Sequence, residues 1–204
     1  MISGRSVRLN SDIEQLLINF FNQHQPNIIG IFLGGSATSP YIENPHDYDI
    51  FIVWANPEER NNAIPDIKIL QQQRDEIDSA YRFINRHIHE YENHNKRHWL
   101  IYNYLFPYNQ LIIGENPYTV FIDILTEWNS IYPELVHSIK RAHYQKWFYH
   151  ILTTLYIWKN QSYELTPEQL TNVQIVHDQS NSQKIEELYQ WALEELNKYK
   201  KDSE

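Results

Sequence analysis

Two short segments carry the side chains best suited to chemistry in this chain. The first is Gly34-Gly35-Ser36, and the second, after a spacer of ten residues, is Asp47-Tyr48-Asp49. Two glycines at the end of an apolar run allow backbone amides to approach a phosphate group closely. The Ser36 hydroxyl can add a hydrogen bond to a phosphate oxygen. The first segment therefore predicts triphosphate binding.

The second segment predicts a site for a divalent cation. Alternate residues of a strand project from the same face, so we expect the carboxylates of Asp47 and Asp49 to lie side by side. Their repulsion is relieved by a cation such as Mg²⁺, with Mn²⁺ as the alternative. The apolar residues that follow, from Ile50 to Val53, make an uncompensated charge costly. The alternative is a glycine turn beside two hydrated aspartates.

The two segments, with the apolar run Ile28-Ile29-Gly30-Ile31-Phe32-Leu33 before them, resemble the signature of the DNA polymerase beta nucleotidyltransferase superfamily. This resemblance implies transfer of a nucleoside monophosphate from an NTP, such as ATP, to an acceptor hydroxyl. It implies that Asp47 and Asp49 are the catalytic metal ligands. It also implies that Gly34, Gly35 and Ser36 hold the nucleotide.

A looser similarity links the rest of the chain to a family of predicted bacterial and phage nucleotidyltransferases. The segments that carry it are Gly114-Glu115-Asn116-Pro117, Lys146-Trp147-Phe148-Tyr149-His150 and Glu164-Leu165-Thr166-Pro167. In that family the catalytic half is followed by a helical half. We therefore expect the same order here.

The chain departs from the superfamily pattern at the third carboxylate, which active members place on a later strand. Counted back from Asn116-Pro117, that position falls near His98-Trp99, where no acidic residue stands. The candidates to replace it are Glu90, Glu92, Asp123 and His98. The alternative function is therefore a catalytically degenerate nucleotide-binding protein, either a sensor or an antitoxin-like interaction protein.

Lys140, Arg141 and Lys146 form the densest basic cluster of the second half. A charge run of this kind is usually a solvated face. An acidic protein that handles a nucleotide must nevertheless gather its few cations near the phosphates. On that ground Lys140 is a candidate nucleotide-binding residue.

The ten histidines do not predict a zinc site from their spacing. His143 and His150 are seven residues apart and could share a helix face, but no carboxylate motif accompanies them, and the chain has no cysteine. The segment Arg82-Phe83-Ile84-Asn85-Arg86-His87 has the Arg-x4-His form of a helical ribonuclease family. A solvated charged helix is the simpler interpretation of that segment.

The hydrophobic pattern predicts the elements that position these residues. A helix begins at Ser11 and ends before Pro26, strands cover 28–33 and 48–54, and a loop lies between Pro57 and Pro65. A helix is expected over 70–92, and a third strand or a buried helix over 99–106. The remaining helices are expected at 108–114, 118–127, 131–158, 166–178 and 182–200.

The expected fold class is α+β, with a small mixed β-sheet nucleotidyltransferase core at 1–127 and a helical region at 128–204. No apolar run approaches the roughly 18 residues of a membrane-spanning helix, and no apolar segment near Met1 suggests a signal peptide. We therefore expect a cytoplasmic protein with no membrane partner.

The expected partners follow from the charge and from the resemblance. A net charge of -9 argues against nonspecific nucleic-acid binding. The resemblance implies an NTP and an acceptor, which the sequence leaves open among a protein, a small molecule and an RNA.

Overall fold

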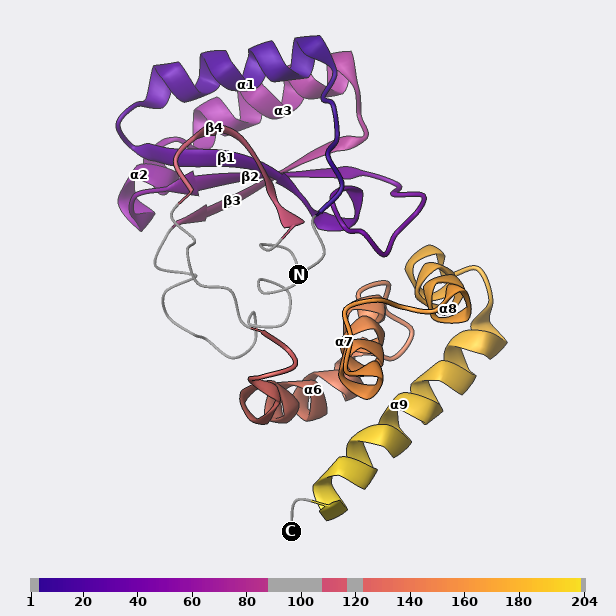
Figure 1. Ribbon diagram of the computed structural model, residues 1–204. Helices are drawn as coiled ribbons and strands as arrows, with labels where there is room; N and C mark the ends of the chain where they lie inside the picture. The colour runs from indigo at the N-terminus through magenta and orange to yellow at the C-terminus, as the bar shows by residue number, and fades with distance from the viewer. Residues whose placement is uncertain (1–3, 88–107, 117–122, 203–204) are drawn as a thin grey trace.

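The computed structural model describes residues 4–87, 108–116 and 123–202 (Figure 1). It confirms the α+β class: a four-stranded mixed sheet comes first, and a group of helices follows it. In Figure 1 the helices of the second half lie beyond one end of the sheet. The sheet and the group of helices are therefore two visibly different parts of the structure.

The sheet has the strand order β3-β2-β1-β4. Strand β1 (Ile28–Gly34) is antiparallel to β2 (Tyr48–Trp54) and to β4 (Gln110–Gly114). Strand β3 (Tyr81–His87) is parallel to β2. The two inner strands, β1 and β2, are the two near-continuous apolar runs, as expected for strands covered on both faces.

Helices α1 (Ser11–His24) and α3 (Ile64–Ile77) cover one face of the sheet (Figure 1). The Asn10 side chain accepts a hydrogen bond from the backbone N–H of Asp12 and so caps α1. The core between these helices and the sheet is made of buried apolar side chains, including Ile13, Leu17, Phe20, Ile31, Ile52 and Leu70. The short helix α2 (Pro57–Asn62) precedes α3.

The second half consists of α6 (Trp128–Ala142), α7 (Phe148–Asn160), α8 (Pro167–Asp178) and α9 (Ser182–Asp202). Helix α7 is the central element, because its residues from Phe148 to Ile157 are all buried and it packs against α6, α8 and α9. The predicted start of α8 is confirmed: Thr166 caps the helix in a reciprocal capping box with Gln169.

Four sequence predictions are wrong in their secondary structure. The loop predicted between Pro57 and Pro65 contains α2 and the start of α3. The helix predicted over 70–92 stops at Ile77 and is followed by β3. The helix predicted over 108–114 is largely strand β4, and the helix predicted over 131–158 is divided into α6 and α7.

These errors have identifiable physical causes. Proline is tolerated in the first turn of a helix, so Pro57 can be the first residue of α2 and Pro65 the second residue of α3. The short apolar run of β4 does not distinguish strand from helix by periodicity alone. Between α6 and α7 the chain turns at Tyr144, whose φ of 58° lies in the left-handed region and interrupts the helix.

Some predictions fall outside the described residues. They are the element over 99–106, most of the helix over 118–127, and the carboxylate substitutes Glu90, Glu92 and His98. Within the part of the chain that is described, no helix combines the length and the apolar character needed to cross a membrane.

Candidate functional site

The Gly-Gly turn lies directly against the second aspartate. Gly34 ends β1 and pairs with Asp49 near the start of β2. Gly35 begins a short 3-10 turn, Gly35–Ala37, with a φ of +71°, which favours glycine. A Cβ atom on Gly35 would fall 2.2 Å from Oδ2 of Asp49. The two segments separated by ten residues in the sequence are therefore in contact.

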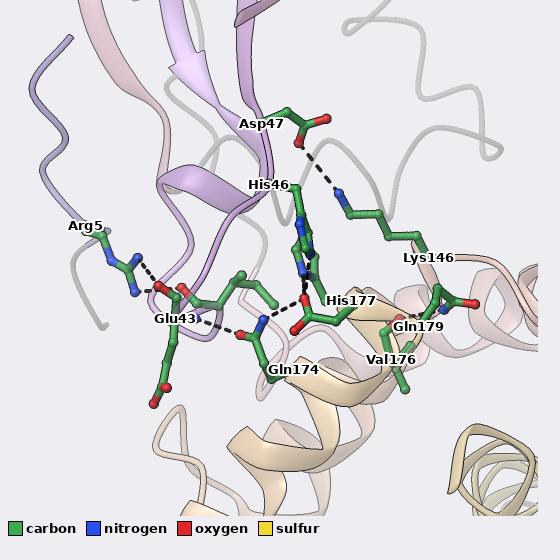
Figure 2. Close-up of polar contacts among 11 residues, drawn as sticks. Arg5, Glu43, His46, Asp47, Lys146, Gln174, Val176, His177 and Gln179 are labelled. Carbon is green, nitrogen blue, oxygen red and sulfur yellow. Dashed lines mark hydrogen bonds and ion pairs between the residues drawn. The ribbon is translucent and has the colours of Figure 1, made fainter. Parts of the chain in front are cut away.

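Asp47 lies one residue before β2 and makes two ion pairs. Its Oδ2 is 3.0 Å from Nε of Arg82 on β3, and its Oδ1 is 3.6 Å from Nζ of Lys146. Lys146 comes from the turn between α6 and α7, so its pair with Asp47 joins the sheet to the helical half (Figure 2). The Asp47 carboxylate is thus already neutralised by cations of the chain.

Asp49 has a different environment. The pKa of its carboxyl group is raised to about 6, chiefly because burial penalises the charged form, and secondly because Asp47 is near. The positive charges of Lys146 and Arg82 lower the pKa of Asp49, but by less than burial and Asp47 raise it. Within the described residues, the Asp49 carboxylate makes no ion pair or hydrogen bond. Asp49 is therefore the carboxylate that would gain most from an added cation.

Unpartnered polar atoms surround the glycine turn. The Ser36 hydroxyl is buried and has no hydrogen-bond partner within the described residues. Both polar side-chain atoms of Asn109 are in the same condition, and Asn109 lies against Gly34, where an added Cβ would be 2.2 Å from Oδ1. Buried polar groups are normally satisfied, so these atoms fit a polar ligand at the turn.

The helical half contributes further side chains to this region. The buried Tyr149 on α7 has a pKa raised by burial and by the negative charges of Asp49 and Asp47. Gly35 and Tyr149 line one small cavity together with Ser39, Tyr41, Tyr108, His150 and Thr153. In the basic cluster of the second half, Lys146 contacts Asp47, whereas the predicted nucleotide-binding residue Lys140 is exposed in the last turn of α6.

The strand beside Asp49 carries a cation where a third carboxylate could stand. Asp49 pairs with Arg82 in the parallel register of β2 and β3, and β3 contains no Asp or Glu. The segment Arg82–His87 belongs to strand β3, so both helical interpretations of it are wrong, the solvated charged helix as well as the helical ribonuclease motif. Asp123 is not at the site either: it accepts a hydrogen bond from Tyr163 at 2.7 Å.

A second polar cluster, which the sequence analysis missed, adjoins the first. His46 lies one residue before Asp47, and its Nε2 is 2.8 Å from Oδ1 of Asp178 at the end of α8. Nδ1 of His177 is 2.8 Å from the same oxygen. No local spacing could reveal this cluster, since position 46 is more than a hundred residues from 177 and 178. The histidines that were weighed for zinc are engaged elsewhere: His143 contacts Glu186, and His150 is buried on α7.

The chain matches no family model, and it has no significant match to a curated protein or to a solved structure.

Proposed function

We propose that this protein is a nucleotidyltransferase that moves a nucleoside monophosphate from an NTP to an acceptor hydroxyl. The observation that supports this most strongly is the contact of the Gly34-Gly35-Ser36 turn with Asp49, next to Asp47. In this arrangement, phosphate-binding amides and two carboxylates occupy one end of two neighbouring strands. The proposed triphosphate site and the proposed metal site are therefore adjacent.

The residues present fit a divalent cation such as Mg²⁺. Asp49 is a partly buried carboxylate with a raised pKa and no partner within the described residues, and Asp47 stands two residues away. When bound, such a cation supplies charge neutralisation at the α-phosphate and favours an attacking oxygen. Asp47 and Asp49 hold it, and the turn at Gly35 and Ser36 orients the phosphates.

Lys146 and Arg82 have a second role in this proposal. Both pair with Asp47 through flexible side chains that are well exposed, 41% for Lys146 and 67% for Arg82. With Asp47 engaged by the cation, the side chains of Lys146 and Arg82 would be available to contact phosphate oxygens. The acceptor is left open among a protein, a small molecule and an RNA.

The test combines binding with turnover. Isothermal titration with Mg²⁺ and each NTP is expected to give binding to the wild type, and at least about 100-fold weaker binding to Asp49→Asn, because a ligand itself is lost. Asp75→Asn, an exposed aspartate on α3, is the matched control and should bind normally. No binding to the wild type, or equal binding to Asp49→Asn, contradicts the proposal.

One observation favours a second candidate function, a nucleotide-binding protein without transfer activity. Arg82 stands opposite Asp49 on β3, a strand without any acidic residue, so the described part of the site lacks a third carboxylate to act as general base. Incubation with α-labelled NTPs and candidate acceptors separates the two functions. A labelled acceptor supports the transferase, and NTP binding without label supports the degenerate protein.

A further inference from the structure

The cluster of His46, His177 and Asp178 joins the two halves of the molecule. His46 belongs to the segment that leads into β2, whereas His177 and Asp178 are the last two residues of α8. Both histidines direct a ring nitrogen to within 2.8 Å of Oδ1 of Asp178. One potential ligand atom from each residue lies within 4.8 Å of the others. Two imidazoles and one carboxylate therefore converge from distant parts of the chain.

The rings of His46 and His177 are stacked nearly in parallel, and one nitrogen of each ring lies close to Asp178. The centroids of His46 and His177 are 5.1 Å apart, with an interplanar angle of 16° (Figure 2). The His177 side chain is almost fully buried, with 1% of it exposed. Its Nε2 has no hydrogen-bond partner within the described residues, so the polar contact of this ring is the one that Nδ1 makes inside the cluster.

The surrounding contacts hold the cluster in place. The Gln174 side chain donates from Nε2 to Oδ1 of Asp178 at 2.8 Å, and its Oε1 accepts from the backbone N–H of Glu43 at the same distance. Arg5 in turn donates to the backbone oxygens of Ile42 and Glu43 (Figure 2). The segment that carries His46 is thus fixed to α8 and to the N-terminal residues. Outer contacts of this kind orient metal ligands.

We propose that His46, His177 and Asp178 form a second metal site, for a divalent transition metal of the Zn²⁺ class. Imidazole nitrogens favour such metals, whereas the carboxylate pair at Asp47 and Asp49 favours Mg²⁺. Three protein ligands leave a fourth position for water. Asp178 supplies the negative charge of the cluster. The nearby cation Lys146 is paired with Asp47. The bound metal fastens α8 to the segment before β2.

The test uses Co²⁺, which reports tetrahedral nitrogen and oxygen ligation by visible absorption, and then Zn²⁺ in competition. The wild type is expected to develop this absorption and to lose it when Zn²⁺ is added. His46→Gln changes a half-exposed side chain and should leave the fold intact. It should weaken Co²⁺ binding by more than the roughly 10- to 100-fold that the loss of an outer contact causes.

Two comparison variants make the result specific. His137→Gln removes an exposed histidine of α6 and should bind Co²⁺ as the wild type does. Asp47→Asn/Asp49→Asn should also keep the Co²⁺ absorption, so the metal site and the proposed nucleotide site can fail separately. The proposal is overturned if the wild type shows no such absorption, or if His46→Gln and Asp178→Asn bind Co²⁺ as tightly as the wild type.

Discussion

His46 and Asp47 are neighbours in the chain, but their side chains belong to two clusters with different chemistry. Asp47 lies beside a second carboxylate and is paired with Arg82 and Lys146. The imidazoles of His46 and His177 both contact the carboxylate of Asp178, and the two rings are stacked on each other. The first cluster offers carboxylate oxygens next to the Gly34-Gly35-Ser36 turn, and the second offers imidazole nitrogens between the two halves of the molecule.

The difference shows how the short segment before β2 can contribute side chains to two separate clusters. The backbone just before β2 directs consecutive side chains in different directions, toward β3 and the α6–α7 turn from Asp47, and toward α8 from His46. Movement of this segment would disturb both clusters together. The predictions below separate the clusters by changing residues that belong to only one of them.

The largest effect is expected on nucleotide binding when the two clusters are changed one at a time. Asp49→Asn should weaken the binding of an NTP with Mg²⁺ by at least about 100-fold, because a metal ligand itself is lost. Asp178→Asn should change NTP binding less than about threefold, because Asp178 belongs only to the other cluster. A threefold change corresponds to less than about 1 kcal/mol. Isothermal titration measures both. A similar loss in the two variants would show that the clusters act as one site.

The next effect concerns stability and follows from the raised pKa of Asp49. The folded protein holds this proton up to about pH 6, whereas the unfolded chain releases it near pH 3.8, the ordinary pKa of an aspartate. The folded state therefore binds more protons between these values, and stability falls as the pH rises through them, by about 2–3 kcal/mol.

Urea unfolding of the metal-free protein, measured between pH 4 and pH 7, should show this decline. Asp49→Asn should remove the decline and be the more stable protein at pH 7. Mg²⁺ should raise the stability of the wild type at pH 7 because it binds the folded state. A wild-type profile that does not fall with pH, or an Asp49→Asn variant without extra stability, would contradict the assigned burial of this carboxylate.

A smaller loss of stability, about 1–2 kcal/mol, is expected for Gly35→Ala. The change forces a residue with a Cβ atom to adopt a φ of +71° and places that atom against the Asp49 carboxylate. Gly35→Asn separates the two causes, because asparagine tolerates the left-handed region but keeps the Cβ contact. Combining Gly35→Ala with Asp49→Ala should recover part of the loss, as measured by a double-mutant cycle. Strict additivity would mean that the two residues are not in contact.

The smallest effect is expected for Lys146→Met. The ion pair is long, at 3.6 Å, and its Lys146 side chain is 41% exposed, so it contributes less than about 1 kcal/mol to stability and thermal unfolding should change little. The variant should bind Mg²⁺ without nucleotide more tightly, because a competing cation has been removed from Asp47. Lys140→Met, at the exposed end of α6, is the comparison and should leave Mg²⁺ binding unchanged. If the two variants bound Mg²⁺ equally well, the result would contradict a position of Lys146 at the metal site.

The elements that local patterns specify were predictable. Strands β1 and β2 follow from continuous apolar runs bounded by glycine, proline and polar residues, and α8 follows from the capping sequence at Thr166. The paired segments Gly34-Gly35-Ser36 and Asp47-Tyr48-Asp49 were also visible, because β1 and β2 are adjacent in sequence and pair directly. Strand β4 was missed, since its short apolar run acquires its structure from pairing with β1.

The sequence by itself determined the α+β order, the Gly34-Gly35-Ser36 turn and the neighbouring pair of aspartates, because each depends on residues close together in the chain. Only the tertiary structure decided which groups surround them. The parallel pairing of β2 and β3 places Arg82 opposite Asp49, and the packing of the helical half brings Lys146 and Asp178 to Asp47 and His46. Contacts between residues so far apart arise from burial of two separate cores and leave no periodic signal in the sequence.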